Sequence, residues 1–453
     1  MLTFESLVAA GLDLDPANHS FTYTYPPARV AKRDGSAGGL VADRIDGWSD
    51  YSLYLHIPFC RMTCRFCSLH RELISGVDRV NKYDAALLRE IRMFRALAGE
   101  RTIHSLYVGG GTPTSLPVDA LAQAISEATT GATKRRIEIT VECAPDESRS
   151  ANDWSRYFST LRSLDTPVSR LSIGVESGHE ATLSHMGRRG GLEAIANVGR
   201  AADASFDAYN IDLLLGYPDQ PDYSGSVDAA RVIAAVEWLR SEGLRMPNIS
   251  IYQMWDVGFV PATRPPSTVK AAAYEVWRAK AEVQRYLFDS GYRPGPGCTY
   301  VSETGNEHQW TRHRCFDFRH VGLGSGSYSF LPNAFSQRPR DIDSYVAACE
   351  NASSYADLDG RISETYVLTE DEREMRRVIL GLRSTDWTAR PFESPGTAEL
   401  RAKLKVLGAA GILEADAASI RLSRDSFSWS NEISAALHPA DTPRTWRTAH
   451  ARR

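Results

Sequence analysis

The stretch that decides the fold of this chain is "YLHIPFCRMTCRFC", residues 54–67. It begins like a buried strand and ends in three cysteines, Cys60, Cys64 and Cys67, spaced C-x3-C-x2-C. The chain has seven cysteines, an odd number, and the others stand singly, so a disulfide framework is not expected. Three thiolates this close together indicate metal ligands.

Two kinds of metal site compete for these thiolates. A structural zinc ion takes four protein ligands, and His70 is a nearby residue that could complete such a site. A cubane [4Fe–4S] cluster is normally held by four thiolates, one on each iron. Three thiolates leave one iron open to another ligand, and the spacing favours this cluster over zinc.

The cysteine pattern, with the aromatic Phe66 directly before the last cysteine, resembles the signature of the radical S-adenosylmethionine (SAM) superfamily. The preceding "YLHIPF" resembles the oxygen-independent coproporphyrinogen III oxidase-like (HemN-like) group of that superfamily. This resemblance implies a [4Fe–4S] cluster whose open iron binds SAM, and reductive cleavage of SAM to methionine and a 5′-deoxyadenosyl radical. It also implies an electron donor such as flavodoxin or ferredoxin.

Composition limits the class of protein. The 453 residues are 43% apolar and 24% charged, with a formal net charge of −4, as in a globular enzyme. Neither charge forms a long block, so nucleic acid and membranes are not expected as partners. No signal segment is recognisable, and no apolar run approaches the roughly 18 residues that span a membrane. We expect a cytoplasmic monomer that acts on a small molecule.

Short apolar segments alternate with helical ones. Segment 80–97 places Tyr83, Leu87, Ile91 and Phe94 at helical spacing. The expected strands are "YSLYLHI", "HSLYV", "RIEITVEC", "SRLSIGVES", "DAYNIDLLL" and "NISIYQMW". Strands separated by helices form βαβ units around a parallel sheet. The resemblance implies an α/β fold, the partial (β/α)6 TIM-type barrel of radical SAM enzymes, with its site at the carboxyl ends of the strands.

Three parts of the chain are expected. Residues 1–45, with "FTYTYPPARV", predict an extended N-terminal arm, and residues 46–340 predict the barrel. Residues 341–453 resemble the small helical, winged-helix-like C-terminal domain of the same family. Within it, Thr369 and Glu372 have the spacing of a capping box, which predicts the start of a helix.

A glycine run, "GGGTP", follows the second expected strand. Gly110, Gly111 and Thr112 lie where the resemblance places a loop whose backbone reaches the amino group of SAM. Glu142 ends the next strand and matches a glutamate that contacts SAM. A glycine run alone more often marks a turn, and a lone strand-end glutamate is more often solvated than functional. The glycine run and Glu142 follow successive strands, and this placement favours SAM binding over a plain turn and a solvated glutamate.

Later strands supply further matches to SAM-binding residues. Glu176 stands where the family usually has glutamine, and either side chain accepts hydrogen bonds from ribose hydroxyls. Arg188, in "HMGRR", matches the arginine that pairs with the SAM carboxylate. Asp212 matches an aspartate near the nucleoside, and Tyr54 a tyrosine near the cluster. His56 is expected to be structural, donating to a nearby backbone group.

Two departures argue against a porphyrinogen substrate. The coproporphyrinogen enzymes carry another cysteine where this chain has Leu69, and they favour a small residue where Trp255 is aligned. The resemblance then favours a class C methyltransferase of secondary metabolism, which binds two SAM molecules and methylates or cyclopropanates an sp2 carbon. Phe66, Trp255 and Tyr328 are expected to hold the second SAM, with Tyr328 also acting in catalysis.

Rival functions exist within the same family. One is oxidative decarboxylation of porphyrinogen propionates, which yields vinyl groups without carbon transfer. The other is a haem-binding chaperone, which carries haem rather than converting it. The resemblance alone does not separate these three activities.

A second cluster of possible ligands lies late in the barrel. His308, His313 and Cys315 fall in "NEHQWTRHRCFD" and allow a second metal site. The alternative is that this segment is a substrate-facing or surface loop.

Overall fold

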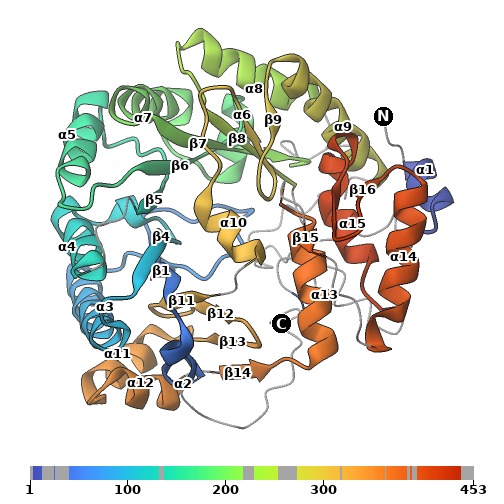
Figure 1. Ribbon diagram of the computed structural model, residues 1–453. Helices are drawn as coiled ribbons and strands as arrows, with labels where there is room; N and C mark the ends of the chain where they lie inside the picture. Colours follow the sequence, from blue (N-terminus) through green and yellow to red (C-terminus); the bar gives the residue numbers. More distant parts are fainter. Residues whose placement is uncertain are drawn as a thin grey trace.

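The computed structural model describes residues 4–12, 25, 40–131, 137–217, 229–253, 273–316, 319–362, 364–384, 388–389 and 395–439. One large, curved sheet occupies the centre, helices cover its outer face, and a smaller, mainly helical part stands beside it (Figure 1). Most of the predicted N-terminal arm lies outside the described residues. Every helix that the structure describes is too short or too polar to span a bilayer.

Parallel strands form the middle of the sheet. In spatial order they are β11 (His320–Leu323), β1 (Asp50–Ile57), β4 (Thr102–Gly110), β5 (Glu138–Cys143), β6 (Arg170–Glu176), β7 (Ala208–Leu215) and β8 (Asn248–Gln253). The row from β1 to β8 contains the strands that the sequence predicts, in the predicted order. The α/β partial barrel is therefore confirmed, and β11 adds a further parallel strand beside β1.

Antiparallel strands extend both edges of this row. Beyond β11 follow β12 (Tyr328–Leu331), β13 (Ala334–Gln337) and β14 (Glu364–Val367), and beyond β8 follow β10 (Thr299–Val301) and β9 (Arg293–Pro294). Two short strands, β2 (Phe59–Cys60) and β3 (Glu72–Leu73), pair separately after the end of β1. Among the described residues the large sheet has twelve strands and ends at β14 and β9, which do not pair with each other.

Helices between the strands bury the outer face of the sheet. They are α3 (Val77–Ala98), α4 (Val118–Thr129), α5 (Ala151–Arg162), α6 (Glu180–Met186), α7 (Gly191–Ser205), α8 (Ala229–Ser241) and α9 (Ala273–Asp289). The predicted face of α3, formed by Tyr83, Leu87, Ile91 and Phe94, is buried in the same core as Leu55 of β1. The helical spacing read from the sequence is thus the spacing that fills this core.

Helix α10 (Gln309–Phe316) closes the amino-terminal end of the barrel. The N–H groups of Gln309 and Trp310 point to the Glu138 carboxylate at the start of β5, at 3.0 and 3.4 Å. The Trp310 ring lies 5.8 Å from the ring of Tyr54 and 5.5 Å from that of Tyr107. These rings form a floor beneath the carboxyl ends of the strands.

The C-terminal part has its own hydrophobic core. It contains α13 (Glu370–Gly381), α14 (Ala398–Ala409), α15 (Ser430–Ala436) and a sheet of β15 (Thr388–Ala389), β17 (Ser419–Leu422) and β16 (Leu413–Ala415). Helix α1 (Phe4–Ala9) joins this core through Leu7. The Thr369 hydroxyl accepts from Glu372 N–H at 3.2 Å, and Glu372 Oε2 from Thr369 N–H at 2.9 Å, which confirms the capping box. Lys280 of α9 pairs with the buried Glu432 of α15 at 3.1 Å and links the two cores.

Helices α11 (Ile342–Asn351) and α12 (Tyr355–Ile362) pack with α2 (Leu40–Arg44) and α3 as part of the barrel core. A buried ion network holds them there. Glu90 of α3 accepts from Gly324 N–H at 2.8 Å and from the Tyr345 hydroxyl at 2.6 Å. Arg338 donates to Glu90 at 2.9 Å and to Asp359 at 2.7 Å. Because these charges are buried, each needs its partner.

Replacing Arg338 with methionine should destabilise the protein by about 3–5 kcal/mol, because it leaves two buried carboxylates without their cation. Urea unfolding followed by circular dichroism measures this. Arg79→Met is the control, because Arg79 forms partly exposed ion pairs with Glu72 and Asp343, and it should cost about 1 kcal/mol or less. Equal costs for the two variants would show that the network does not stabilise the fold.

Candidate active site

The three predicted cluster ligands lie on one loop beyond the end of β1. Cys60 is buried, Cys64 and Cys67 are partly buried, and all three are free thiols. Cys67 N–H donates to the Cys64 carbonyl at 3.3 Å, which turns the loop. Arg65 N–H donates to the Met186 carbonyl at 2.9 Å, which fastens the loop to α6. The loop therefore holds its thiols on one fixed segment.

The donor set fits a cluster. Among the residues that the structure describes, no three His, Cys, Asp or Glu side chains converge closely enough to hold a single ion. A cubane cluster takes one thiolate on each iron, so its ligands need not meet at one point. The alternative zinc ligand His70 lies 3.3 Å from Ser325 Oγ through its Nε2. Burial raises the pKa of Cys67 to about 11, so cluster assembly must displace a proton from this thiol.

The glycine run after β4 is bonded to the strand that carries the first cysteine. Gly111 N–H donates to the Ile57 carbonyl at 2.7 Å, and Thr112 N–H to the Phe59 carbonyl at 2.8 Å. Thr112 Oγ1 lies 3.5 Å from Cys60 Sγ. These contacts bring the predicted SAM loop directly against a predicted cluster ligand.

Glu142 lies on the other side of the same run. Gly110 has a φ of 116°, where L side chains are rarely found, and its N–H donates to Glu142 Oε2 at 2.9 Å. A Cβ on Gly109 would lie 2.8 Å from the Glu142 carboxyl carbon. The Tyr107 hydroxyl donates to Glu142 Oε1 at 2.7 Å. The glycines are needed here because Glu142 and the loop approach each other so closely.

Three carboxyl groups face one another in the barrel interior. Burial, together with the neighbouring Glu176 carboxyl, raises the pKa of Glu142 to about 7 and that of Asp212 to about 8. Asp212 accepts from the Ser172 hydroxyl at 2.8 Å and from Asn210 Nδ2 at 2.6 Å. A cationic ligand at this place would favour the ionised carboxylates.

Glu176 and Arg188 were predicted to contact different parts of SAM, and the structure pairs them with each other. Arg188 Nη2 donates to Glu176 Oε1 at 2.6 Å, and their side chains are only 10% and 11% exposed. Glu176 has a φ of 67°, a strained conformation that costs of order 1–3 kcal/mol and is typical of functional sites. The glutamate in place of glutamine thus neutralises part of the arginine's charge.

Tyr54 and His56 form a short hydrogen-bonded chain. His56 Nε2 lies 3.1 Å from the His70 carbonyl, which can only accept, so Nε2 carries the proton. His56 Nδ1 then accepts from the Tyr54 hydroxyl at 3.0 Å. Burial lowers the pKa of His56 to about 3, so the ring stays neutral. The structural role predicted for His56 is confirmed, while SAM binding by Tyr54 stays a prediction.

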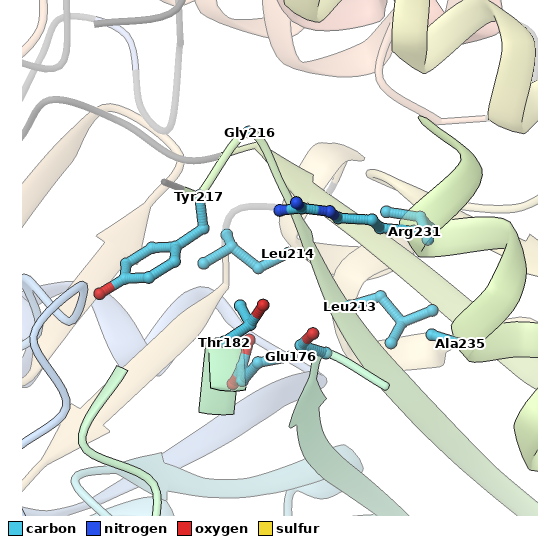
Figure 2. Close-up of a pocket in the computed structure, with 10 residues that line it drawn as sticks. Glu176, Thr182, Leu213, Leu214, Gly216, Tyr217, Arg231 and Ala235 are labelled. Atoms are coloured by element: carbon cyan, nitrogen blue, oxygen red, sulfur yellow. The ribbon is translucent and has the colours of Figure 1, made fainter. Parts of the chain in front are cut away.

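A pocket opens between the ends of β6 and β7 and the helices α6 and α8 (Figure 2). Arg231 extends across it toward Leu214 and Gly216. Phe66 of the cluster loop packs edge-on against Tyr217, with ring centres 6.3 Å apart. Sequence reasoning missed Tyr217 and Arg231. The only signal for Tyr217 was its place in "LLLGYP", directly after β7.

The structure describes two of the three residues predicted to hold a second SAM, Phe66 and Tyr328. Trp255 lies outside the described residues. Phe66 lies 5.7 Å from the Arg188 guanidinium, measured to the ring centre. Tyr328 starts β12, and its ring stacks on Phe330 with centres 6.1 Å apart. A shared site for Phe66, Trp255 and Tyr328 stays a prediction.

The possible second metal site is only partly described. His308 Nδ1 lies 2.9 Å from the Thr311 hydroxyl and its Nε2 3.4 Å from the Thr140 hydroxyl. Its ring centre lies 5.5 Å from that of Tyr107 and its side chain is 12% exposed, so His308 is not part of a surface loop. The side chains of His313 and Cys315 lie outside the described residues.

Residues 54–224 match the sequence model of the radical SAM superfamily. Over these residues the chain is similar to the radical SAM superfamily. The matched span includes the cluster loop, the glycine run and the contacts predicted for the cleaved SAM, from Tyr54 to Asp212.

The chain is also similar to individual HemN-like proteins. It is 24% identical over 344 residues to the heme chaperone HemW of Bacillus subtilis, covering 74% of this chain and 83% of that protein. It is 28% identical over 319 residues to the oxygen-independent coproporphyrinogen III oxidase of Pseudomonas aeruginosa, covering 66% of each. The fold matches coproporphyrinogen III oxidase (HemN) from Escherichia coli with a TM-score of 0.72 at 19% identity, over 94% of this chain and 99% of that one.

The pH dependence of folding stability should reveal the raised pKa of the buried Asp212 carboxyl. In the metal-free protein, Asp212 keeps its proton up to about pH 8, whereas in the unfolded chain it ionises near pH 4. The stability of the wild type relative to Asp212→Asn should therefore fall as the pH rises from about 5 to 8.5. Thermal melting across this range measures the difference.

Asp153→Asn is the control for this experiment. Hydrogen bonds from Ser150 and Arg156 lower the pKa of Asp153 to about 2, so it stays ionised throughout the range. The difference in stability between Asp153→Asn and the wild type should therefore stay constant with pH. If the stability difference between the wild type and Asp212→Asn is also independent of pH, the pKa of Asp212 is not raised.

Arg188→Ala should weaken SAM binding by about ten- to a hundredfold, the effect of losing a charged hydrogen bond. Equilibrium dialysis with anaerobically reconstituted protein measures this. The exposed neighbour Arg189 gives the control, because Arg189→Ala should bind SAM like the wild type. Unchanged affinity in Arg188→Ala would show that "HMGRR" is misaligned.

Proposed function

We propose that this chain cleaves SAM reductively and uses the product to take a hydrogen atom from a small-molecule substrate over the carboxyl ends of the barrel strands. The observation that carries the proposal is the contact between the two binding loops, where Thr112 Oγ1 lies 3.5 Å from Cys60 Sγ. When bound, the cluster and SAM supply a 5′-deoxyadenosyl radical. A donor such as flavodoxin or ferredoxin provides the electron.

The residues of the chain orient SAM in this proposal. Arg188 binds the carboxylate of SAM, while Glu142 and the Gly110 backbone bind its amino group. Asp212 and Glu176 accept from the ribose hydroxyls, as their acceptor oxygens allow. Ionised Glu142 and Asp212 also favour a ligand that carries a sulfonium and an ammonium group. The aromatic floor of Tyr54, Tyr107 and Trp310 keeps water from the lower side of the site.

The relatives support a tetrapyrrole substrate. One relative is named for oxidation of coproporphyrinogen III and another as a chaperone of heme. The first candidate reaction is therefore oxidative decarboxylation of a porphyrinogen propionate. In this reaction the radical takes a hydrogen from the propionate side chain, and carbon dioxide leaves as the vinyl group forms with loss of a second electron to an acceptor. The chaperone relative suggests an alternative within the same substrate class, in which the chain binds haem without converting it.

Carbon transfer from a second SAM is the other candidate. It is favoured by Leu69, a residue that is 55% exposed and that stands where the coproporphyrinogen enzymes carry a further cysteine. Phe66 supports it by offering an aromatic face beside Arg188. The relatives do not favour this reaction over decarboxylation.

One labelling experiment separates the candidates. The reconstituted, reduced protein is incubated with coproporphyrinogen III and with SAM that carries a trideuterated methyl group. Decarboxylation predicts carbon dioxide, vinyl products and unlabelled 5′-deoxyadenosine by mass spectrometry. Carbon transfer to a suitable acceptor predicts deuterium in both 5′-deoxyadenosine and the product.

Two controls complete the experiment. Cys64→Ala removes a predicted cluster ligand and should abolish 5′-deoxyadenosine. Titration with haem tests the chaperone activity, because specific binding shifts the Soret band in proportion to protein. Formation of 5′-deoxyadenosine by Cys64→Ala at the wild-type rate would contradict the proposal for all candidate substrates.

A further inference from the structure

Arg71 ends the cluster loop at a point where the backbone is fixed on both sides. Directly after it, Glu72 N–H donates to the Pro58 carbonyl at 2.7 Å. Two residues further on, Ile74 N–H donates to the Cys60 carbonyl at 3.0 Å. These bonds belong to the pairing of β2 with β3, which ties the two ends of the loop together. Arg71 therefore projects from a rigid base.

The guanidinium of Arg71 reaches back across the loop that it closes. Its Nη1 donates to the carbonyls of Cys67 at 2.7 Å and Leu69 at 3.2 Å, and its Nη2 donates to that of Cys64 at 3.3 Å. Two of these three carbonyls belong to predicted cluster ligands. The Cys64 carbonyl also accepts from Cys67 N–H, so Arg71 reinforces that turn of the loop and adds a donor for the carbonyls of Cys67 and Leu69.

The charge of Arg71 is directed at the loop. The adjacent carboxylate, Glu72, pairs with Arg79 instead. The Nε–H group of Arg71 is buried and has no hydrogen-bond partner among the residues that the structure describes. Buried donors nearly always have an acceptor, and cluster and cysteine sulfurs accept hydrogen bonds from N–H groups.

We propose that Arg71 is a positioning residue of the cluster site: it holds the backbone of Cys64 and Cys67 in the shape that presents three thiols, and its charge raises the reduction potential of the bound cluster. This inference rests on the proposed function for the cluster. It adds a residue that lies outside the cysteine motif and that the sequence analysis did not single out.

Two properties of arginine matter separately. Its planar fork is what allows one group to hold several carbonyls, which a lysine ammonium on a flexible stem does less well. Its positive charge favours the reduced cluster, which carries one more negative charge than the oxidised one. Arg71→Lys therefore keeps the charge without the fork, and Arg71→Gln removes both.

The loop itself gives the first test, without any cluster. Hydrogen–deuterium exchange of metal-free protein should show amides between residues 61 and 70 exchanging about tenfold faster in Arg71→Gln than in the wild type. Arg61→Gln is the matched control on the same loop, because Arg61 is half exposed and lies 3.6 Å from Asp146 rather than on the loop carbonyls. Equal exchange in all three proteins overturns the positioning role.

The second test uses reconstituted protein without substrate. Iron loss to a chelator should be faster in both Arg71 variants than in Arg61→Gln, and a redox titration followed by electron paramagnetic resonance should give a more negative potential only in Arg71→Gln. Wild-type potential and iron retention in Arg71→Gln overturn the inference and leave the proposed function intact. Failure of the wild type to assemble a [4Fe–4S] cluster contradicts the proposed function and the charge effect together, while the exchange result still decides the positioning role.

Discussion

The site depends on the hydrogen bonds that join the ends of β1 and β4 beyond the sheet. Gly111 and Thr112 donate to the carbonyls of Ile57 and Phe59, so the glycine run follows the chain that leads into the cluster loop. Side chains at these glycines would collide with neighbouring atoms. Cys60 is therefore held against the loop that should receive the amino acid part of SAM, and parallel strand ends place the remaining contacts on the same edge.

Charge balance is the second constraint on the site. Buried carboxyls at Glu142 and Asp212 have raised pKa values, while Glu176 is held by Arg188. The interior is thus short of positive charge in the absence of a ligand. A compound with both a sulfonium and an ammonium group would supply it, so we expect SAM binding to release protons from these carboxyls. Glutamate instead of glutamine at position 176 adds a negative charge to the site, and this charge pairs with Arg188.

Local patterns were enough to predict much of the fold. The strand sequence, the buried face of α3 and the capping box at Thr369 depend on nearby residues, and the structure confirms each of them. Contacts between distant segments were beyond such reasoning. The sequence carried no sign that Trp310 fills the barrel floor, that Glu176 binds Arg188, or that Arg71 donates to the cluster loop. Each of these contacts joins different segments of the chain, and only the fold brings those segments together.

The central claim is that three thiolates leave an open iron for SAM. The most direct measurement is the electron paramagnetic resonance spectrum of the reduced, reconstituted protein before and after SAM is added. The account predicts a [4Fe–4S] signal whose g-values change on SAM addition in the wild type, because SAM becomes a ligand of the cluster. A [4Fe–4S] signal that stays the same at saturating SAM would contradict it.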